Sequence, residues 1–175
     1  QGFGDARFKL MDARKLELGY KFDACVCMFA ALGYVTETSE LIQTLANFRR
    51  HLRDEGLFIC DVWNGLGVMH QLPGTRVKVV EKDGIKVIRI AESVLESARH
   101  ICKIDFRTIV VQKGHQVDDI RETHLMRFFF PQELDHYLEE AGFRVLRTSP
   151  FMKLESRLDE SEWNMMLVAQ AIGGK

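Results

Sequence analysis

The sequence predicts an α/β fold in which an antiparallel β-sheet is inserted into a partly parallel one. Three observations predict it. Residues 22–64 have the pattern of a strand, a helix and a strand, residues 75–130 alternate in polarity, and a helix and two strands follow. The 175 residues, 46% of them hydrophobic, suffice to bury a sizeable core.

The β-α-β unit opens with the apolar run Phe22–Phe29, typical of a strand buried on both faces of a parallel sheet. Residues 36–53 follow with the spacing of an amphipathic helix. The apolar side chains on one side of that helix are Leu41, Ile42, Leu45, Phe48 and Leu52. Gly56–Val62 is the second strand, and a shorter strand is expected at Arg7–Met11, ahead of the unit.

The middle of the chain predicts antiparallel strands, because apolar and polar side chains alternate from Cys102 to Val110. Asp83-Gly84 and Lys113-Gly114 supply hairpin turns. Pro131 then begins a helix that ends at Gly142, and two strands follow near residues 143–148 and 163–171. We expect an α/β core in residues 1–64, a β insertion in residues 65–130, and the rest of the core in residues 131–175.

Composition narrows the class of protein. The net charge is −1 and no basic stretch stands out, which predicts no nucleic-acid partner. No apolar stretch is long enough to cross a membrane, and the four cysteines lie in apolar runs, which favours reduced thiols in the cytoplasm. Cys25 and Cys27 lack a second pair at zinc spacing, so we expect core packing and no metal site.

Functional residues are expected where the parallel strands end, because open parallel sheets bind small molecules beyond the carboxyl ends of their strands. The two predicted ends are Met28–Tyr34 and Asp61–Asn64. Phe29 and Trp63, taken singly, favour core positions over a ligand wall. Asp61 lies inside an apolar run, so it either accepts backbone hydrogen bonds or faces a pocket.

Four stretches together resemble the class I S-adenosylmethionine-dependent methyltransferases, and most closely those that methylate nitrogen on small molecules. They are Phe8–Leu16 (FKLMDARKL), Phe22–Val35 (FDACVCMFAALGYV), His51–Asn64 (HLRDEGLFICDVWN) and His124–Phe143 (HLMRFFFPQELDHYLEEAGF). The resemblance implies a partial Rossmann-like methyltransferase sheet, S-adenosylmethionine as cofactor, and methyl transfer to a small-molecule acceptor, in particular an amine. It also implies that the inserted sheet covers the pocket.

The resemblance further implies residue roles. Asp12 and Ala13 occupy the position that binds adenine, although an aspartate there is also a common turn residue. The loop that lines the methionine part of the cofactor corresponds to Met28, Phe29 and Ala30. The strand end that borders the acceptor corresponds to Asp61, Trp63 and Asn64. We expect these three segments to gather along one rim of the sheet.

Three further residues are candidates from their own chemistry. His124 is the predicted catalytic base, and a hydrogen-bonded histidine on a half-buried strand is the alternative. Tyr34 either caps the pocket with its hydroxyl or fills the seam between helix and sheet. Arg127 either binds an anionic acceptor or pairs with Glu133 at the surface.

One departure from the family pattern shapes the functional expectation. The family's glycine-rich loop after its first strand has no counterpart, because no strand precedes Gly2-Phe3-Gly4 and Gly65-Leu66-Gly67 lies at the wrong end of the sheet. Both segments are expected to be loops. We therefore expect a truncated sheet whose exposed edge weakens cofactor binding by this chain alone. The alternative function is a non-catalytic methyltransferase remnant that forms a homodimer through that edge or binds a partner.

Overall fold

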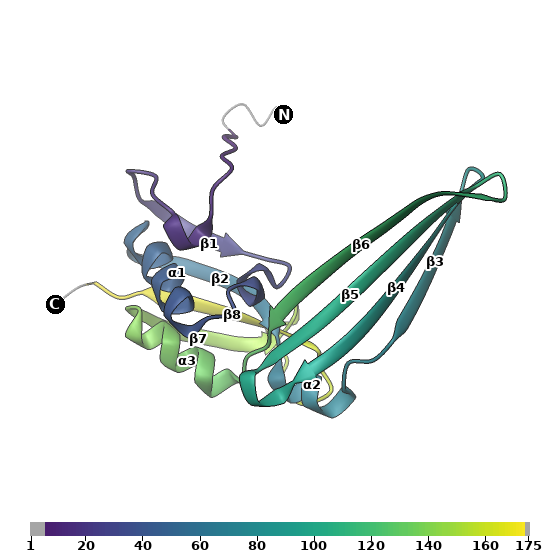
Figure 1. Ribbon diagram of the computed structural model, residues 1–175. Coiled ribbons are helices and arrows are strands. Elements are labelled where there is room, and N and C mark those ends of the chain that lie inside the picture. The colour runs from purple at the N-terminus through teal and green to yellow at the C-terminus, as the bar shows by residue number, and fades with distance from the viewer. Residues whose placement is uncertain (1–5, 174–175) are drawn as a thin grey trace.

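The computed structural model describes residues 6–173 and contains two four-stranded sheets (Figure 1). The first sheet has the order β1-β2-β8-β7. Its strands are β1 (Phe22–Cys27), β2 (Leu52–Trp63), β7 (Phe143–Pro150) and β8 (Asn164–Ala171). β1 and β2 are parallel and the other pairs are antiparallel. The predicted β-α-β unit and the two C-terminal strands are confirmed.

Two helices, α1 (Thr38–Arg50) and α3 (Pro131–Glu140), cover one face of this sheet (Figure 1). Each contributes leucines at a spacing of four, which places them on the same side of the helix. The fully buried leucines are Leu41, Leu45, Leu134 and Leu138. Ile42 was predicted to share that side, which is wrong: it is 45% exposed, because it is turned away from Leu41 and Leu45.

Two predictions about the N-terminal part are wrong. Arg7–Met11 forms no strand, and Phe8 is 94% exposed, because no neighbouring strand among residues 6–173 pairs with this segment. β1 is not buried on both faces: it lies at an edge of the sheet, and Val26 is 60% exposed. The predicted loop at Gly2-Phe3-Gly4 lies outside the described residues.

The second sheet is the predicted antiparallel insertion, with strands in sequence order. They are β3 (Arg76–Lys82), β4 (Ile85–Glu96), β5 (Ile101–Gln112) and β6 (His115–Arg127). Both predicted hairpin turns are confirmed, because Asp83-Gly84 and Lys113-Gly114 have positive φ at each position, as tight hairpin turns require. The sheet extends well beyond the first one (Figure 1).

The insertion leaves and re-enters the core at adjacent points. The Gly65 N–H donates to the Phe129 carbonyl at 2.8 Å, and the Phe129 N–H donates to the Trp63 carbonyl at 3.0 Å. This closure fits the expected boundaries near residues 64 and 130, and the division into three segments stays a prediction. Gly65-Leu66-Gly67 is not the expected loop but the first turn of α2 (Gly65–Gln71).

No helix among residues 6–173 combines the length and the apolar character needed to cross a bilayer.

The Gly67 position offers a test of this packing. A Cβ atom there would lie 2.3 Å from the Glu162 carbonyl oxygen, whereas nothing lies within 4 Å of a Cβ at Gly74. Alanine normally favours a helix over glycine by about 1 kcal/mol. We expect Gly67→Ala nevertheless to lower the urea midpoint, and Gly74→Ala to leave it nearly unchanged. Equal midpoints in both variants would contradict the close contact.

Candidate active site

The ends of β1 and β2 are joined by a hydrogen bond. After β1 the chain turns through two residues in the left-handed region, Phe29 (φ 63°) and Ala30 (φ 55°). The Ala30 N–H then donates to Asp61 Oδ2 at 3.0 Å. Left-handed non-glycine residues cost about 1–3 kcal/mol each and persist where surrounding contacts enforce them. Two of the three segments expected on one rim, the turn at residues 28–30 and the β2 tip, therefore lie together.

Asp61 is the most unusual polar group of this rim. Its side chain is buried, with 2% of the residue exposed, and Oδ1 has no hydrogen-bond partner within residues 6–173. Of the two predicted roles, backbone acceptance is confirmed by the Ala30 contact. A buried acceptor without a donor costs about 1–3 kcal/mol. Oδ1 is thus a buried acceptor whose hydrogen-bonding capacity the described residues leave unused.

Cysteine chemistry is disfavoured on this sheet. Burial, and then the charge of Asp61, raise the pKa of the Cys27 thiol to about 11. Burial likewise raises the pKa of Cys25 to about 11. Both thiols are therefore protonated at neutral pH, and a thiolate nucleophile is not present at the strand ends. No group of side chains in the described part of the chain could hold a metal ion.

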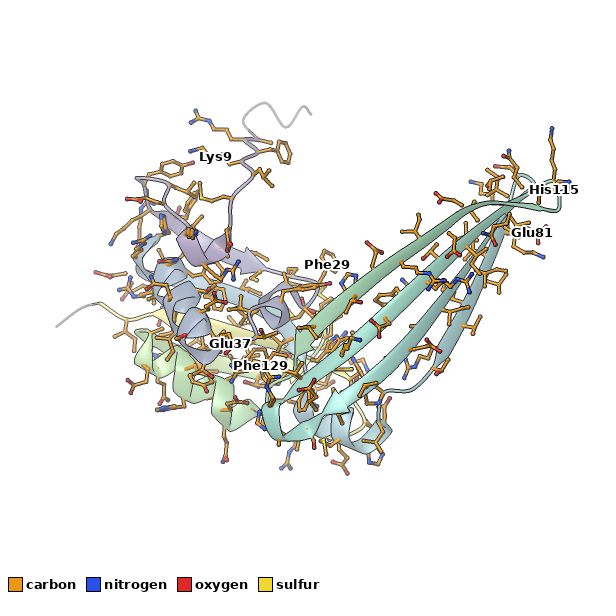
Figure 2. All side chains as sticks on the ribbon, in the orientation of Figure 1. Lys9, Phe29, Glu37, Glu81, His115 and Phe129 are labelled. Atoms are coloured by element: carbon orange, nitrogen blue, oxygen red, sulfur yellow. The ribbon has the colours of Figure 1, made fainter. Side chains whose placement is uncertain are left out.

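The structure corrects the predicted core position of Phe29. Its sequence context favours a core position, but the side chain is 86% exposed and projects from the turn after β1 (Figure 2). The positive φ of the turn directs Phe29 outward and places Ala30 inward. Ala30 packs against Cys102, Ile104 and Met126 of the second sheet. The turn thereby connects both sheets.

Tyr34 and His124 are brought together from opposite halves of the chain. Tyr34 ends the short 3-10 helix η2 (Ala31–Tyr34), and its hydroxyl lies 2.7 Å from His124 Nδ1 on β6. The His124 ring also meets Phe106 edge-on, with ring centroids 5.1 Å apart. The ring is therefore held from two sides, and its second nitrogen has no protein partner among the contacts of the described residues.

A pocket of about 400 Å³ opens beside this pair, at the base of the second sheet. The aromatic residues of its wall are Trp63, Phe106 and Trp163, and the cations are Arg76, Lys78 and Arg89. Trp63 and Trp163 meet edge-on at 5.2 Å. Phe106 contacts both the pocket and His124, so the pocket and the Tyr34–His124 pair share a wall.

Asn64 has a structural role, and its contact with an acceptor stays a prediction. It is fully buried and caps α2, where its Oδ1 accepts from the Leu66 N–H at 3.2 Å. Its Nδ2 donates to the carbonyl oxygens of Asp159 and Glu162 at 3.0 and 2.8 Å. These contacts use the hydrogen-bonding groups of the amide. Asn64 therefore anchors the loop that carries Trp163 into the pocket.

The contacts of Arg127 are structural, and its binding of an acceptor stays a prediction. Arg127 pairs with Glu133, which was one of its two predicted roles. The pair lies in the interior and not at the surface, because Arg127 is 5% exposed and its Nη2 donates to Glu133 Oε1 at 2.7 Å. The guanidinium also lies over the Phe129 ring, 5.2 Å from the centroid. Its strand face is opposite to that of His124, because odd and even residues of β6 alternate between the faces. Arg127 thus fastens β6 to α3.

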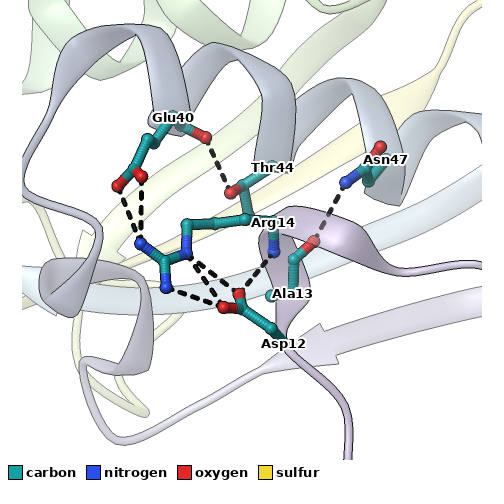
Figure 3. Close-up of polar contacts among 6 residues, drawn as sticks. All are labelled: Asp12, Ala13, Arg14, Glu40, Thr44 and Asn47. Carbon is teal, nitrogen blue, oxygen red and sulfur yellow. Dashed lines mark hydrogen bonds and ion pairs between the residues drawn. The ribbon is translucent and has the colours of Figure 1, made fainter.

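Asp12 and Ala13 begin the short helix η1 (Ala13–Lys15), which is tied to α1 (Figure 3). Asp12 accepts from the Arg14 backbone N–H at 2.9 Å and from Arg14 Nη2 at 2.7 Å. Arg14 Nη1 continues to Glu40 at 3.0 Å, and the Ala13 carbonyl accepts from Asn47 Nδ2 at 3.1 Å. Hydrogen bonds from Arg14 hold the pKa of Asp12 at about 2.

The position of Asp12 agrees with both of its predicted roles. It is a turn residue, since it caps η1. Its carboxylate is partly exposed, and Arg14 links it to the first turn of α1, which follows the carboxyl end of β1. Contact with adenine stays a prediction.

The chain was compared with known proteins. No known family profile matches it. A Streptomyces venezuelae dTDP-3-amino-3,4,6-trideoxy-alpha-D-glucopyranose N,N-dimethyltransferase is 31% identical over 147 residues, 81% of this chain and 58% of that protein. Among solved structures, Streptomyces venezuelae DesVI is 26% identical, with a TM-score of 0.73 over 93% of this chain and 64% of that one. In sequence and fold, the chain is similar to S-adenosylmethionine-dependent class I methyltransferases.

Two further similar proteins are also described as methyltransferases. A Clostridium acetobutylicum S-adenosylmethionine-dependent methyltransferase superposes with a TM-score of 0.82 over 97% of the chain and 66% of the solved one, at 17% identity, which shows the fold. The putative methyltransferase YqeM of Bacillus subtilis is 24% identical over 129 residues, 74% of the chain. The chain spans 58% and 51% of the lengths of the two curated relatives.

The sequence patterns did not identify most of the residues that line the pocket. Arg89 and Phe106 lie on strands that were predicted, but the side of the insertion that faces the core could not be read from alternation alone. Trp163 was seen only as the start of a strand. The sequence does carry one signal for this face: arginine, alanine and serine occupy the alternate positions 89, 91 and 93 of an otherwise largely apolar strand.

The buried Arg127–Glu133 pair predicts that two arginines of the second sheet contribute unequally to the stability of the fold. Removing one partner of a buried pair costs about 3–5 kcal/mol, whereas exposed pairs are worth about 0–1 kcal/mol. We expect Arg127→Gln to destabilise the fold strongly in urea, and Arg107→Gln, which breaks a more exposed pair with Asp119, to do so weakly. Similar losses in both variants would argue against an interior role for Arg127.

The Asp12–Arg14 contact predicts a titration. The carboxyl pKa is lowered from 3.8 to about 2 by hydrogen bonds from Arg14, so the stabilisation it provides is present above pH 3.8 and is lost as the pH falls through about 2. We expect the Asp12 carboxyl ¹³C resonance to titrate near pH 2, and near its ordinary value in Arg14→Gln. Lys15→Gln is the control, with a nearly unchanged midpoint. An ordinary midpoint in the wild-type chain would refute the contact.

Proposed function

We propose that this chain takes part in S-adenosylmethionine-dependent methyl transfer to the nitrogen of a small-molecule acceptor. The observation that carries the proposal is the rim where Ala30 meets Asp61, because a buried carboxylate oxygen without a donor stands there beside the Tyr34–His124 pair. The Streptomyces venezuelae relative is named an N,N-dimethyltransferase of an amino sugar. A solved relative is described as an S-adenosylmethionine-bound amino pentose methyltransferase.

The residues of the chain fit such a reaction. When bound, the cofactor supplies a methyl group that is already reactive toward a nitrogen lone pair. The chain contributes mainly by orientation, since holding the reactants in line accounts for most of the gain in such transfers. Asp61 Oδ1 is the proposed acceptor for an N–H of a bound amine, because it is a buried carboxylate oxygen without a donor among the described residues. Asp12, Ala13 and the turn at residues 28–30 are the proposed cofactor contacts.

His124 is the proposed base. As the nitrogen–carbon bond forms and the carbon–sulfur bond breaks, the amine carries one proton too many. The second nitrogen of the His124 ring would take that proton; the contact between Tyr34 and Nδ1, which holds the ring, supports this assignment. Base catalysis contributes about 10²–10⁴-fold when a proton moves in the transition state. A base acting before or after the transfer has a smaller effect on the rate.

A second candidate function is a module that oligomerises through β1. The observation that favours it is the position of this strand at a sheet edge, with Val26 exposed beside unpaired backbone groups. Such edges readily pair with another chain. In that case the methyltransferase fold would serve assembly instead of catalysis.

Calorimetry with S-adenosylhomocysteine, combined with turnover on a panel of small primary amines, amino sugars and amino acids, tests the proposal. We expect Asp12→Ala to weaken cofactor affinity about tenfold, since it removes a charged hydrogen-bonding group. His124→Ala is expected to lower turnover and leave cofactor affinity unchanged. Glu81→Gln, at the far end of the second sheet (Figure 2), is the control and should change neither.

Two outcomes would count against methyl transfer. Cofactor affinity that Asp12→Ala leaves unchanged would remove the proposed adenine contact. A stable dimer by light scattering, without affinity for S-adenosylmethionine or its demethylated product, would favour the oligomerising module instead.

A further inference from the structure

Three cations at the base of the second sheet have no ion-pair partner among residues 6–173. Arg76 and Lys78 lie on β3, and Arg89 lies on β4. All three line the pocket of about 400 Å³. By contrast, Arg107 and Lys103 on the neighbouring β5 each pair with an aspartate. Three cations without an ion-pair partner therefore lie together at the wall of one pocket.

The register places like charges directly opposite each other. Lys78 pairs with Arg89 across the β3–β4 ladder, and Arg76 pairs with Ala91, one diagonal step from Arg89. Like charges that face each other across antiparallel strands destabilise a sheet. The carboxylate of Glu122 shares this sheet face but stands on β6, across from Phe106. A local arrangement that costs stability without an evident compensating contact is typical of a functional site.

Aromatic rings hold two of these cations in place. The Arg76 guanidinium carbon lies 5.5 Å from the centroid of the Trp163 ring, and that of Arg89 lies 5.2 Å from the centroid of the Phe106 ring. Stacking on a ring orients a guanidinium and leaves its N–H groups free at the edges. The two guanidinium groups thus line the pocket already oriented.

From this arrangement we propose that the pocket binds the anionic group, a phosphate or a carboxylate, of the methyl acceptor. Guanidinium groups bind both anions through paired hydrogen bonds. The Phe106 ring that holds Arg89 also contacts His124, so an acceptor bound by its anion at Arg76, Lys78 and Arg89 would extend its other end toward His124. Arg76 and Arg89 would then determine acceptor specificity. This inference rests on the proposed function for the identity of the reaction, but not for the anion site itself.

The test uses a probe already built into the wall. The chain has two tryptophans, and both line this pocket. Inorganic pyrophosphate and glutarate are titrated separately into the wild-type chain without cofactor, at constant ionic strength, while tryptophan fluorescence is followed. We expect a saturable change with one anion or both. Saturation by pyrophosphate identifies a phosphate-bearing acceptor, and saturation by glutarate alone identifies a carboxylate-bearing one.

Matched double variants locate the site. We expect Arg76→Gln with Arg89→Gln to raise the dissociation constant at least tenfold. The control, Lys86→Gln with Arg121→Gln, removes the same charge from the opposite face of the sheet and should change it less than twofold. Circular-dichroism melting of both variants verifies folding.

Two results would overturn the inference: no saturable response of the wild-type chain to either anion, or equal weakening in both double variants. Neither depends on cofactor binding, so the anion site and the proposed methyl transfer can fail separately.

Discussion

The contact between the Ala30 N–H and the Asp61 carboxylate is the constraint on which the rest of the site depends. It joins the ends of two parallel strands, and it holds a turn that the backbone alone would not favour. Because Ala30 packs against Ile104 and Met126, the same turn also contacts the second sheet and holds it next to the first. One buried carboxylate therefore positions the turn, the sheet and, through the following helix η2, the Tyr34 hydroxyl.

Each of the two sheets contributes different residues to the candidate site. The first sheet supplies the rim with Asp61, and α1 anchors η1, the short helix that Asp12 caps. The second sheet supplies His124, Phe106 and the cations of the pocket wall. The side chains of Arg127 and Asn64 form no hydrogen bond with a residue of the pocket wall, yet they fix β6 and the loop before Trp163. Both residues therefore have structural roles, and their contact with an acceptor stays a prediction.

Sequence patterns were sufficient for the elements whose formation depends on local signals. The hairpins at Gly84 and Gly114 require positive φ, and the helix after Pro131 has a clear start and stop. The patterns failed where a neighbour decides the outcome. Val26 lies in an apolar run but has no cover on its face of the sheet, and Arg7–Met11 has strand-like composition but nothing to pair with among the described residues.

Site residues show the same division. Tyr34 and His124 were each suspected from chemistry, but their contact joins positions 90 residues apart and depends on how the insertion folds back. Arg127 looked like a surface residue because strand alternation does not reveal which face meets a helix. The pocket cations were missed because their opposition across β3 and β4 exists only once the register is known.

The closure of the insertion at Gly65 and Phe129 has an evolutionary consequence. Since both junctions are pinned side by side on the core, the hairpins can lengthen, shorten or exchange residues far from these junctions without altering the scaffold beneath. Substitutions or length changes in the hairpin tips can therefore accumulate independently of the core sheet, so long as the two junctions are kept.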